Sequence, residues 1–134
     1  MSQTYVLSTT AEGIVDSLLL HLNSLDVDVM LGFYDPEAIL VSAAGVPLTG
    51  RAGIGAELAG YFSLGLQMSI TARHIFVAGD IASLVLDWSY VGTSRDGRDI
   101  NIVATANDIA RRGADGYWRY LIDNPFGTAR RQPG

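Results

Sequence analysis

The chain has 134 residues, of which 49% are hydrophobic and 17% are charged, with a formal net charge of −5 and no cysteine. This length and apolar content predict one globular domain over residues 1–134, with an ordered core over about residues 8–127. Without cysteine there is no disulfide, thiolate nucleophile or cysteine-ligated metal, and the acidic charge argues against nucleic acid as a partner.

Two helical patterns come first along the chain. Residues Thr9 to Glu12 have the spacing of a capping box, and apolar residues follow at helical intervals, so the pattern predicts a helix over about residues 10–23. A second, shorter pattern begins at Asp26 and is expected to end at Pro36, because proline disfavours helix in the residue before it.

The middle of the chain predicts a short strand and a third helix. Residues 38–43 form a β-prone run, and a turn-rich connection then leads to a helix that starts near Gly50. The residues that this helix is expected to bury are Ile54, Leu58, Tyr61 and Phe62.

From Met68 onward the hydrophobic period changes to two, and Gly-Asp or Asp-Gly pairs separate the segments. The predicted strands lie near residues 68–78, 81–92, 99–111 and 117–124. A polar tail, TARRQPG, is expected to fray. Helices followed by strands indicate a segregated α+β fold, in which the N-terminal helices pack in the concave face of a strongly curved antiparallel or mixed sheet, a cone-shaped α+β barrel.

Three strings carry a family resemblance: DVDVMLGFYDPEAILVSAAGVPLTGRAGI, IFVAGDIASLVLDWSYVG and ANDIARRGADGYWRYLIDNPFG. Their shared features are the Asp-rich start of the second helix, Gly50-Arg51 at the third helix, the Gly-Asp hairpin and the turn from Asp115 to Trp118. The chain resembles the nuclear transport factor 2-like superfamily, which includes ketosteroid isomerase and the SnoaL-like polyketide cyclases. The resemblance covers most of residues 10–127 and extends to a bacterial branch that ends in a Trp-Arg…Asp-Asn-Pro string.

The resemblance implies only part of the isomerase chemistry. It places Ser42 where ketosteroid isomerase has its proton-abstracting aspartate, and Leu18 where that enzyme has its oxyanion-hole tyrosine. It places Asp108 where the isomerase has its second, protonated oxyanion-hole aspartate. The superfamily's epoxide hydrolases are less similar, because no Arg-x-Asp pair occurs in residues 99–111.

Asp108 also stands out without any relative, because it continues an apolar strand pattern. Ile100, Ile102, Ala104 and Ala106 precede it at every second position and therefore share its face. The alanines leave space beside the carboxyl, and such a face is typical of the wall of a ligand cavity. The alternative is a structural carboxylate that bonds backbone or an arginine.

The place of Asp123 depends on the turn at Asp115-Gly116. A two-residue turn sets Asp123 directly opposite Asp108, about 5 Å away at Cβ, and two acids so close in an apolar cavity share a proton near neutral pH. A three-residue turn with a glycine bulge instead pairs Asp108 with Ile122 and turns Asp123 to the other face. The hydrophobic pattern slightly favours the second arrangement, the family alignment favours the first, and both stay open.

Other residues are candidates for the cavity wall. Trp88 either clamps a flat ligand or fills the core, and His74 either donates a hydrogen bond into the pocket or is structural. Tyr34 and Tyr61 come from predicted helices that face the sheet. With catalytic roles expected for Asp108 and Asp123, the expected ligand-binding residues are Tyr34, Tyr61, His74, Trp88, Ala104 and Ala106.

Two functions follow from these residues. The first is a cofactor-independent enzyme of isomerase, cyclase or hydratase type, in which Asp108 and Asp123 transfer protons on a small apolar metabolite. The second is a non-catalytic ligand-binding or accessory module of the same fold. No cofactor motif is complete, and neither histidine has a partner at a metal-ligand spacing, so we expect no cofactor and no metal.

The remaining predictions concern partners and location. One sheet face packs on the helices, and the other still carries large residues, either Leu86, Trp88 and Tyr90 or Val103 and Ile109, depending on the register. A homodimer would cover that face. No apolar run spans a membrane and the N-terminus does not have the pattern of a secretion signal, so we expect a cytoplasmic protein with no membrane partner.

Overall fold

The computed structural model describes residues 5–128, which form three helices and one six-stranded sheet. The helices are α1 (Ile14–Leu22), α2 (Val27–Leu31) and α3 (Gly50–Phe62). The strands are β1 (Tyr34–Val41), β2 (Pro47–Thr49), β3 (Met68–Ala78), β4 (Ile81–Thr93), β5 (Asp99–Arg112) and β6 (Trp118–Asp123).

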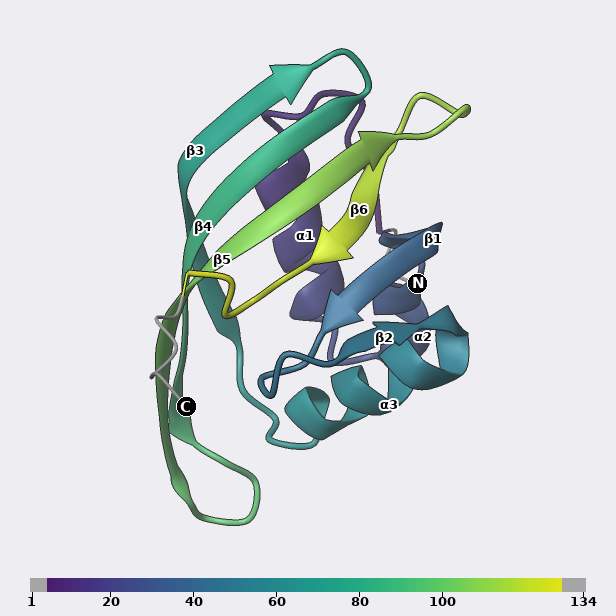
Figure 1. Cartoon of the computed structure of the whole chain (residues 1–134). Coiled ribbons are helices and arrows are strands. Elements are labelled where there is room, and N and C mark those ends of the chain that lie inside the picture. Colours follow the sequence, from purple (N-terminus) through teal and green to yellow (C-terminus); the bar gives the residue numbers. More distant parts are fainter. Residues whose placement is uncertain (1–4, 129–134) are drawn as a thin grey trace.

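The sheet has the strand order β2-β1-β6-β5-β4-β3. Neighbouring strands are antiparallel except β1 and β6, which run parallel, so the sheet is mixed. It curls around α1 and remains open, with β2 and β3 as its two edges (Figure 1). The predicted α+β fold, with helices in the concave face of a curved mixed sheet, is confirmed.

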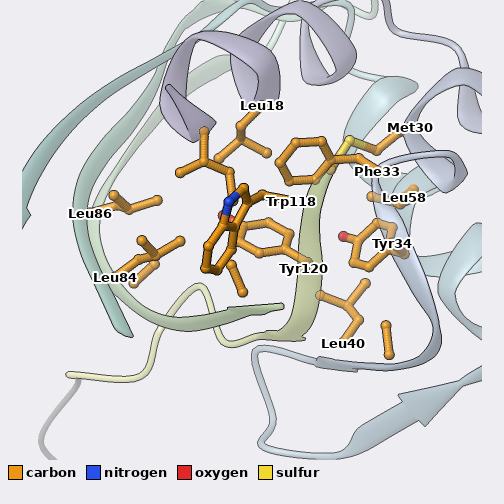
Figure 2. Packing of buried hydrophobic residues seen from close by; sticks show 14 of the residues in the cluster. Leu18, Met30, Phe33, Tyr34, Leu40, Leu58, Leu84, Leu86, Trp118 and Tyr120 are labelled. Carbon is orange, nitrogen blue, oxygen red and sulfur yellow. The ribbon is translucent and has the colours of Figure 1, made fainter. Parts of the chain in front are cut away.

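The core lies between the three helices and the concave face of the sheet. Leu84 and Leu86 of β4 point into it and are at most 1% exposed, and Leu18 of α1 packs against them from the other side (Figure 2). Their alternation along the strand follows from the two-residue period of β structure. Burial of such side chains supplies most of the favourable free energy of folding.

The first helix starts later than its sequence pattern predicts. The hydroxyl of Thr10 accepts a hydrogen bond from the Gly13 N–H at 3.1 Å, which forms a local turn before the helix begins at Ile14. Gly13 is the N-cap and offers no side-chain cap. The predicted capping box is therefore wrong, because a threonine side chain that bonds nearby backbone competes with helix formation.

The second helix is shorter than predicted. The carboxylate of Asp26 caps it by accepting the backbone N–H groups of Asp28 at 3.0 Å and Val29 at 3.3 Å. The helix ends at Leu31, and the chain is already extended at Tyr34, so the prediction that places Tyr34 on a helix is wrong. The short strand β2, which pairs with β1, was not predicted because three residues carry too little periodicity.

The four long strands are confirmed to within one or two residues at their ends. The Gly79-Asp80 turn joins Ala78 to its partner Ile81, and Gly79 has a φ of 62°, which glycine adopts without strain. The tail predicted to fray lies outside the described residues apart from Thr128. Among residues 5–128, no helix is both long enough and apolar enough to cross a membrane.

Candidate functional site

An apolar cavity opens between the helices and the concave side of the sheet. Its empty space measures about 670 Å³ including the open mouth, and about 60 Å³ of that space is wide enough for the centres of water-sized molecules. Its apolar wall includes Leu18, Leu58, Phe62, Met68, Ile70 and Leu86. Within residues 5–128, no arginine or histidine lines it, whereas Asp108 and Asp123 both do.

The hairpin between β5 and β6 has a three-residue turn. Gly113 donates its N–H to the carbonyl of Tyr117 at 2.8 Å, and Gly116 donates to the carbonyl of Gly113 at 2.9 Å. Gly116 has a φ of 84°, the left-handed conformation that a glycine-bulge turn requires. Of the two turns considered from the sequence, the structure contains the three-residue one.

A second irregularity follows in β6. Ala110 pairs with Tyr120, but the preceding residue of β5, Ile109, pairs with Ile122. Leu121 is therefore an extra residue without a partner, which is a β-bulge. The bulge shifts the register by one residue and reverses the faces of every later side chain in β6.

The shifted register brings the two acids together. From Ile122 onward β6 has the register that a two-residue turn would have produced, and the hydrogen bond from Asn107 N–H to the Asn124 carbonyl, 3.1 Å long, continues it. Asp123 therefore turns to the same side as Asp108. Tyr120, which precedes the bulge, also points to this side, so the concave face gains a hydroxyl as well as a second carboxyl.

Asp108 is completely buried, with an exposed fraction of 0%. Its Oδ2 accepts a hydrogen bond from the Tyr120 hydroxyl at 2.7 Å, and its Oδ1 accepts one from the backbone N–H of Asn124, also at 2.7 Å. Burial and the negative charge of Asp123 raise the pKa of Asp108 well above its usual value, although both hydrogen bonds act in the opposite direction.

Asp123 is half-buried and lies at the end of β6. Its Oδ2 accepts a hydrogen bond of 2.5 Å from the hydroxyl of Tyr34. Burial raises the pKa of Asp123 to about 6, against the hydrogen bond from Tyr34, which lowers it. A carboxyl with a pKa of about 6 both accepts and releases a proton near neutral pH, as general acid–base catalysis requires.

The two tyrosines are neighbours because β1 runs parallel to β6 with Tyr34 opposite Tyr120. Their ring centroids are 5.9 Å apart, and Figure 2 shows the two rings side by side in the core. Burial and the nearby carboxyls raise the pKa of both phenols well above the ordinary value, so both hydroxyls keep their protons and act as donors. The site thus consists of two tyrosine–aspartate pairs.

The other predicted ligand-binding residues divide into two groups. Tyr61, Trp88 and Ala106 line the cavity. The indole N–H of Trp88 donates to the carbonyl of Pro125 at 2.8 Å, which ties the segment after β6 across the sheet. Ala104 lies opposite Trp88 in the register and packs against the core, but it is outside the cavity wall.

His74 is far from the position that the sequence suggested. Ala72 pairs with Leu86 and His74 pairs with Val85, so Arg73 is an extra residue in β3. This bulge leaves the His74 ring exposed on the outer face, where the structure shows it away from the cavity. His74 therefore does not donate a hydrogen bond into the pocket. The sequence could not show this, because no residue pattern marks the bulge.

Tyr120 was not among the residues expected in the site. The signal was present, because the three-residue turn considered from the sequence placed Tyr120 on the face of Asp108, and a buried tyrosine hydroxyl needs a polar partner. Nothing in the sequence indicates that the backbone N–H of Asn124 donates to Asp108. Within the described part of the chain, no group of three or more histidine, cysteine or carboxylate side chains is placed to hold a metal ion.

Comparisons with known proteins point in one direction. A family model described as a SnoaL-like domain matches residues 15–121. No curated protein matches the chain. Solved structures do match, among them a ketosteroid isomerase-like protein from Erwinia carotovora atroseptica, with a TM-score of 0.67 and 14% identity over 84% of this chain and 89% of that one.

Two further structures have the same fold at low identity. A nuclear transport factor 2-like superfamily protein from Salmonella enterica serovar Typhimurium has a TM-score of 0.69 and 17% identity, and the match covers 92% of each chain. A structure from Xanthomonas campestris, described as a calcium/calmodulin-dependent protein kinase II association domain, has a TM-score of 0.70 and 12% identity, and the match covers 92% of this chain and 95% of that one. Likeness at such identities establishes the fold and leaves the activity open.

Proposed function

The chain belongs to the SnoaL-like family of the nuclear transport factor 2-like superfamily, and from this premise we propose that it binds a small, flat, largely apolar molecule and moves a proton on it. The reaction is of isomerase or cyclase type, and the pair of Asp108 and Asp123 supplies the carboxyl that accepts and returns the proton. The observation that carries the proposal is this pair of carboxyls in a cavity wall that is mostly apolar.

The size and the lining of the cavity support the choice of ligand. Its small free volume favours a small molecule over a bulky one. The wall contains mostly aliphatic and aromatic side chains, which bind apolar surface. No arginine or histidine lines the wall within residues 5–128, so a phosphate or carboxylate group on the ligand would be repelled by the acids.

The proton transfer needs no other reactant. The ionised carboxyl of the pair accepts a proton from a carbon next to a carbonyl, and the electrons of that C–H bond move to the carbonyl oxygen to give an enolate. Where a C=C bond lies next to that carbon, the enolate extends over the C=C bond. The same carboxyl then returns the proton to the far end of the former C=C bond, so the double bond moves into conjugation with the carbonyl and the composition is unchanged.

A ligand-binding or accessory module is the second candidate. Both tyrosine hydroxyls point at the carboxyls, so these polar groups satisfy one another before any ligand enters. The cavity then presents mainly apolar surface, as a module that only retains a ligand requires.

Deuterium exchange separates the two candidates. We propose 2-tetralone as a flat carbon acid, incubated in D₂O with the protein, with incorporation at the carbon next to the carbonyl followed by proton NMR. The wild type should accelerate exchange, and the double variant Asp108→Asn, Asp123→Asn should lose about 100-fold of that rate, the range for general acid–base groups. The matched control is Asp99→Asn, an exposed carboxyl at the start of β5 that should leave the rate unchanged.

The opposite results are equally definite. Binding of 2-tetralone by the wild type without accelerated exchange of it or of other flat carbon acids would favour the binding module. Equal acceleration by the wild type and the double variant would exclude the two carboxyls as the acid and the base.

A further inference from the structure

Resting on the proposed function, we infer that Asp123, and not Asp108, is the carboxyl that contacts the ligand and accepts its proton, whereas Asp108 is a positioning residue that holds the end of β6 in place. The family resemblance directs attention to Asp108, so this assignment reverses the expected order of the two acids. The assignment rests on the hydrogen bonds that each carboxyl accepts and on the exposure of its oxygens to the cavity.

Asp108 lines the cavity but has no exposed surface that a ligand can reach. Its side chain is 0% exposed, and each of its oxygens already accepts one hydrogen bond of 2.7 Å, from the Tyr120 hydroxyl and from the Asn124 N–H. The second bond reaches the residue that follows Asp123. Asp108 therefore fixes the direction in which the chain leaves β6, and with it the position of Asp123.

Asp123 has one oxygen held and one oxygen available. Tyr34 donates to its Oδ2 at 2.5 Å, and its Oδ1 accepts no hydrogen bond from any residue among 5–128. In the same part of the chain, no buried side-chain oxygen lacks a partner, so Oδ1 must be open rather than enclosed. Because Asp123 lines the cavity and is half-buried, this open oxygen is the one that a ligand can meet.

The charge distribution agrees with this geometry. The pKa of Asp123 is about 6, and the negative charge of Asp123 is one of the causes that raise the pKa of Asp108. At pH 7, which is above this value, Asp123 is mostly ionised, and its charge favours the protonated form of Asp108. A base must be ionised and within reach of the ligand, and Asp123 is the member of the pair that meets both conditions.

The groups around Asp123 come from four elements. Asp108 faces it from β5, Tyr34 from β1, Tyr120 from its own strand, and Tyr61 from α3, where the charge of Asp123 contributes to raising the tyrosine's pKa. Within residues 5–128, no arginine or histidine lines the cavity to compensate the charge. Tyr34 is therefore the main group that favours the ionised form of Asp123, and it acts as a second positioning residue.

Carboxyl carbon NMR tests the assignment without any ligand. In the wild type, Asp123 should titrate with a midpoint near 6, and the pKa of Asp108 should lie well above its ordinary value. Tyr34→Phe should move the midpoint of Asp123 upward, since the lost hydrogen bond favours the ionised form. The exposed control Asp99→Asn should leave the midpoint unchanged. A midpoint near 6 on Asp108 instead of Asp123 would overturn the assignment.

A matched ligand pair tests the contact itself. Naphthalene and 2-naphthol differ by one hydroxyl, and a phenol donates a stronger hydrogen bond to a carboxylate than to a carboxylic acid. In the wild type, 2-naphthol should bind about tenfold more tightly than naphthalene above pH 6, and the advantage should shrink below it. Asp123→Asn should lose this pH-dependent advantage. Asp108→Asn, which loses one of the two bonds that hold the end of β6, should reduce the size of the advantage but keep its pH dependence. The exposed control Asp99→Asn should leave both unchanged.

The outcomes distinguish the inference from the proposed function. If naphthalene binds and the advantage of 2-naphthol survives Asp123→Asn but not Asp108→Asn, the inference is wrong while the cavity remains a ligand site. If neither compound nor 2-tetralone binds the wild type, the proposed function fails and the inference fails with it. Should Asp108→Asn not fold, the wild-type titration and the half-buried variant Asp123→Asn still decide the question.

Discussion

The pKa values of aspartates on the two faces of the sheet shift in opposite directions. Asp87 of β4 points outward, where its carboxylate accepts hydrogen bonds from Arg73 at 2.7 Å and from the Thr105 hydroxyl at 2.6 Å. These bonds lower its pKa, whereas burial and the charge of a second acid raise the pKa of Asp108 on the neighbouring strand. The side of the sheet therefore decides the direction in which the pKa of these aspartates shifts.

The difference lies in the partners that each face offers. Outside the cavity, arginines pair with acids at several points, as Arg111 does with Asp35 and Arg119 with Asp115. Inside it, within residues 5–128, the donors to the carboxyls are tyrosine hydroxyls and one backbone N–H. Neutral donors satisfy a buried acid without neutralising its charge, so the inner acids retain their raised pKa values.

The largest expected effect is the loss of stability when an inward-facing side chain is truncated, compared with an outward-facing one. Leu86 is 1% exposed on the concave face and Val103 is 74% exposed on the outer face. Leu86→Ala should lower the free energy of unfolding by about 2–5 kcal/mol, because it leaves a cavity in the core. Val103→Ala should change it by less than about 0.5 kcal/mol. Urea denaturation of both variants measures the two values, and similar losses would contradict the placement of the two faces.

The next effect separates the faces by pH. Asp115, with a pKa of about 2, and Asp87, with a lowered pKa, stabilise the fold above the unfolded value of about 3.9, and this contribution is lost as the pH falls. Asp123, with a pKa of about 6, and Asp108 bind more protons in the folded state than in the unfolded chain. Their contribution is present near pH 4 and is lost as the pH rises, by about 2 kcal/mol for Asp123 alone.

Urea denaturation between pH 4 and 7 checks this sign. The free energy of unfolding should fall more steeply with pH in the wild type than in the double variant Asp108→Asn, Asp123→Asn. The difference between the two proteins removes contributions from other groups, including His21, whose pKa is lowered by burial. Asp99→Asn again serves as the exposed control. Parallel curves would show that the inner acids titrate as they do in the unfolded chain.

A smaller effect concerns association. The sequence left two sets of residues as candidates for burial against a second copy. The first set, Leu86, Trp88 and Tyr90, faces inward. The second set, Val103 and Ile109, faces outward. We expect a homodimer through this outer face. Val103→Asp should place a charge there and shift the sedimentation of the protein at micromolar concentration toward the 14 kDa monomer, while the stability of the monomer changes little. A wild type that sediments as a monomer would contradict the prediction.

Much of the fold could be predicted because its signals are local. Alternating apolar residues and Gly-Asp or Asp-Gly turns mark the four long strands, and the same alternation identifies Asp108 as an acid on an apolar face. The start of α1 was less well predicted than the starts of α2 and α3, since the side chain of Thr10 bonds local backbone groups instead of capping α1. Such competition depends on the fold of the whole chain.

The position of Asp123 could not be derived from the turn alone. The turn at Gly116 has three residues, which by itself would send Asp123 to the outer face, and the bulge at Leu121 reverses that result. Leucine is an ordinary strand residue, so the sequence carries no sign of the bulge. The same holds for Arg73 in β3, whose bulge turns His74 away from the cavity. Single-residue bulges therefore decide which side chains belong to the site.

The smallest expected effect tests this last point. His74 is exposed, and its ring stacks on Phe76 with centroids 5.2 Å apart and an interplanar angle of 15°. His74→Ala should change the free energy of unfolding by less than about 0.5 kcal/mol and leave the affinity for 2-naphthol unchanged. The matched inward variant, Trp88→Phe, loses the hydrogen bond to Pro125 and should cost about 1 kcal/mol of stability. Because both residues lie in adjacent strands, a loss of 2-naphthol affinity in His74→Ala would mean that the β3 bulge is absent in solution and that the histidine faces the ligand.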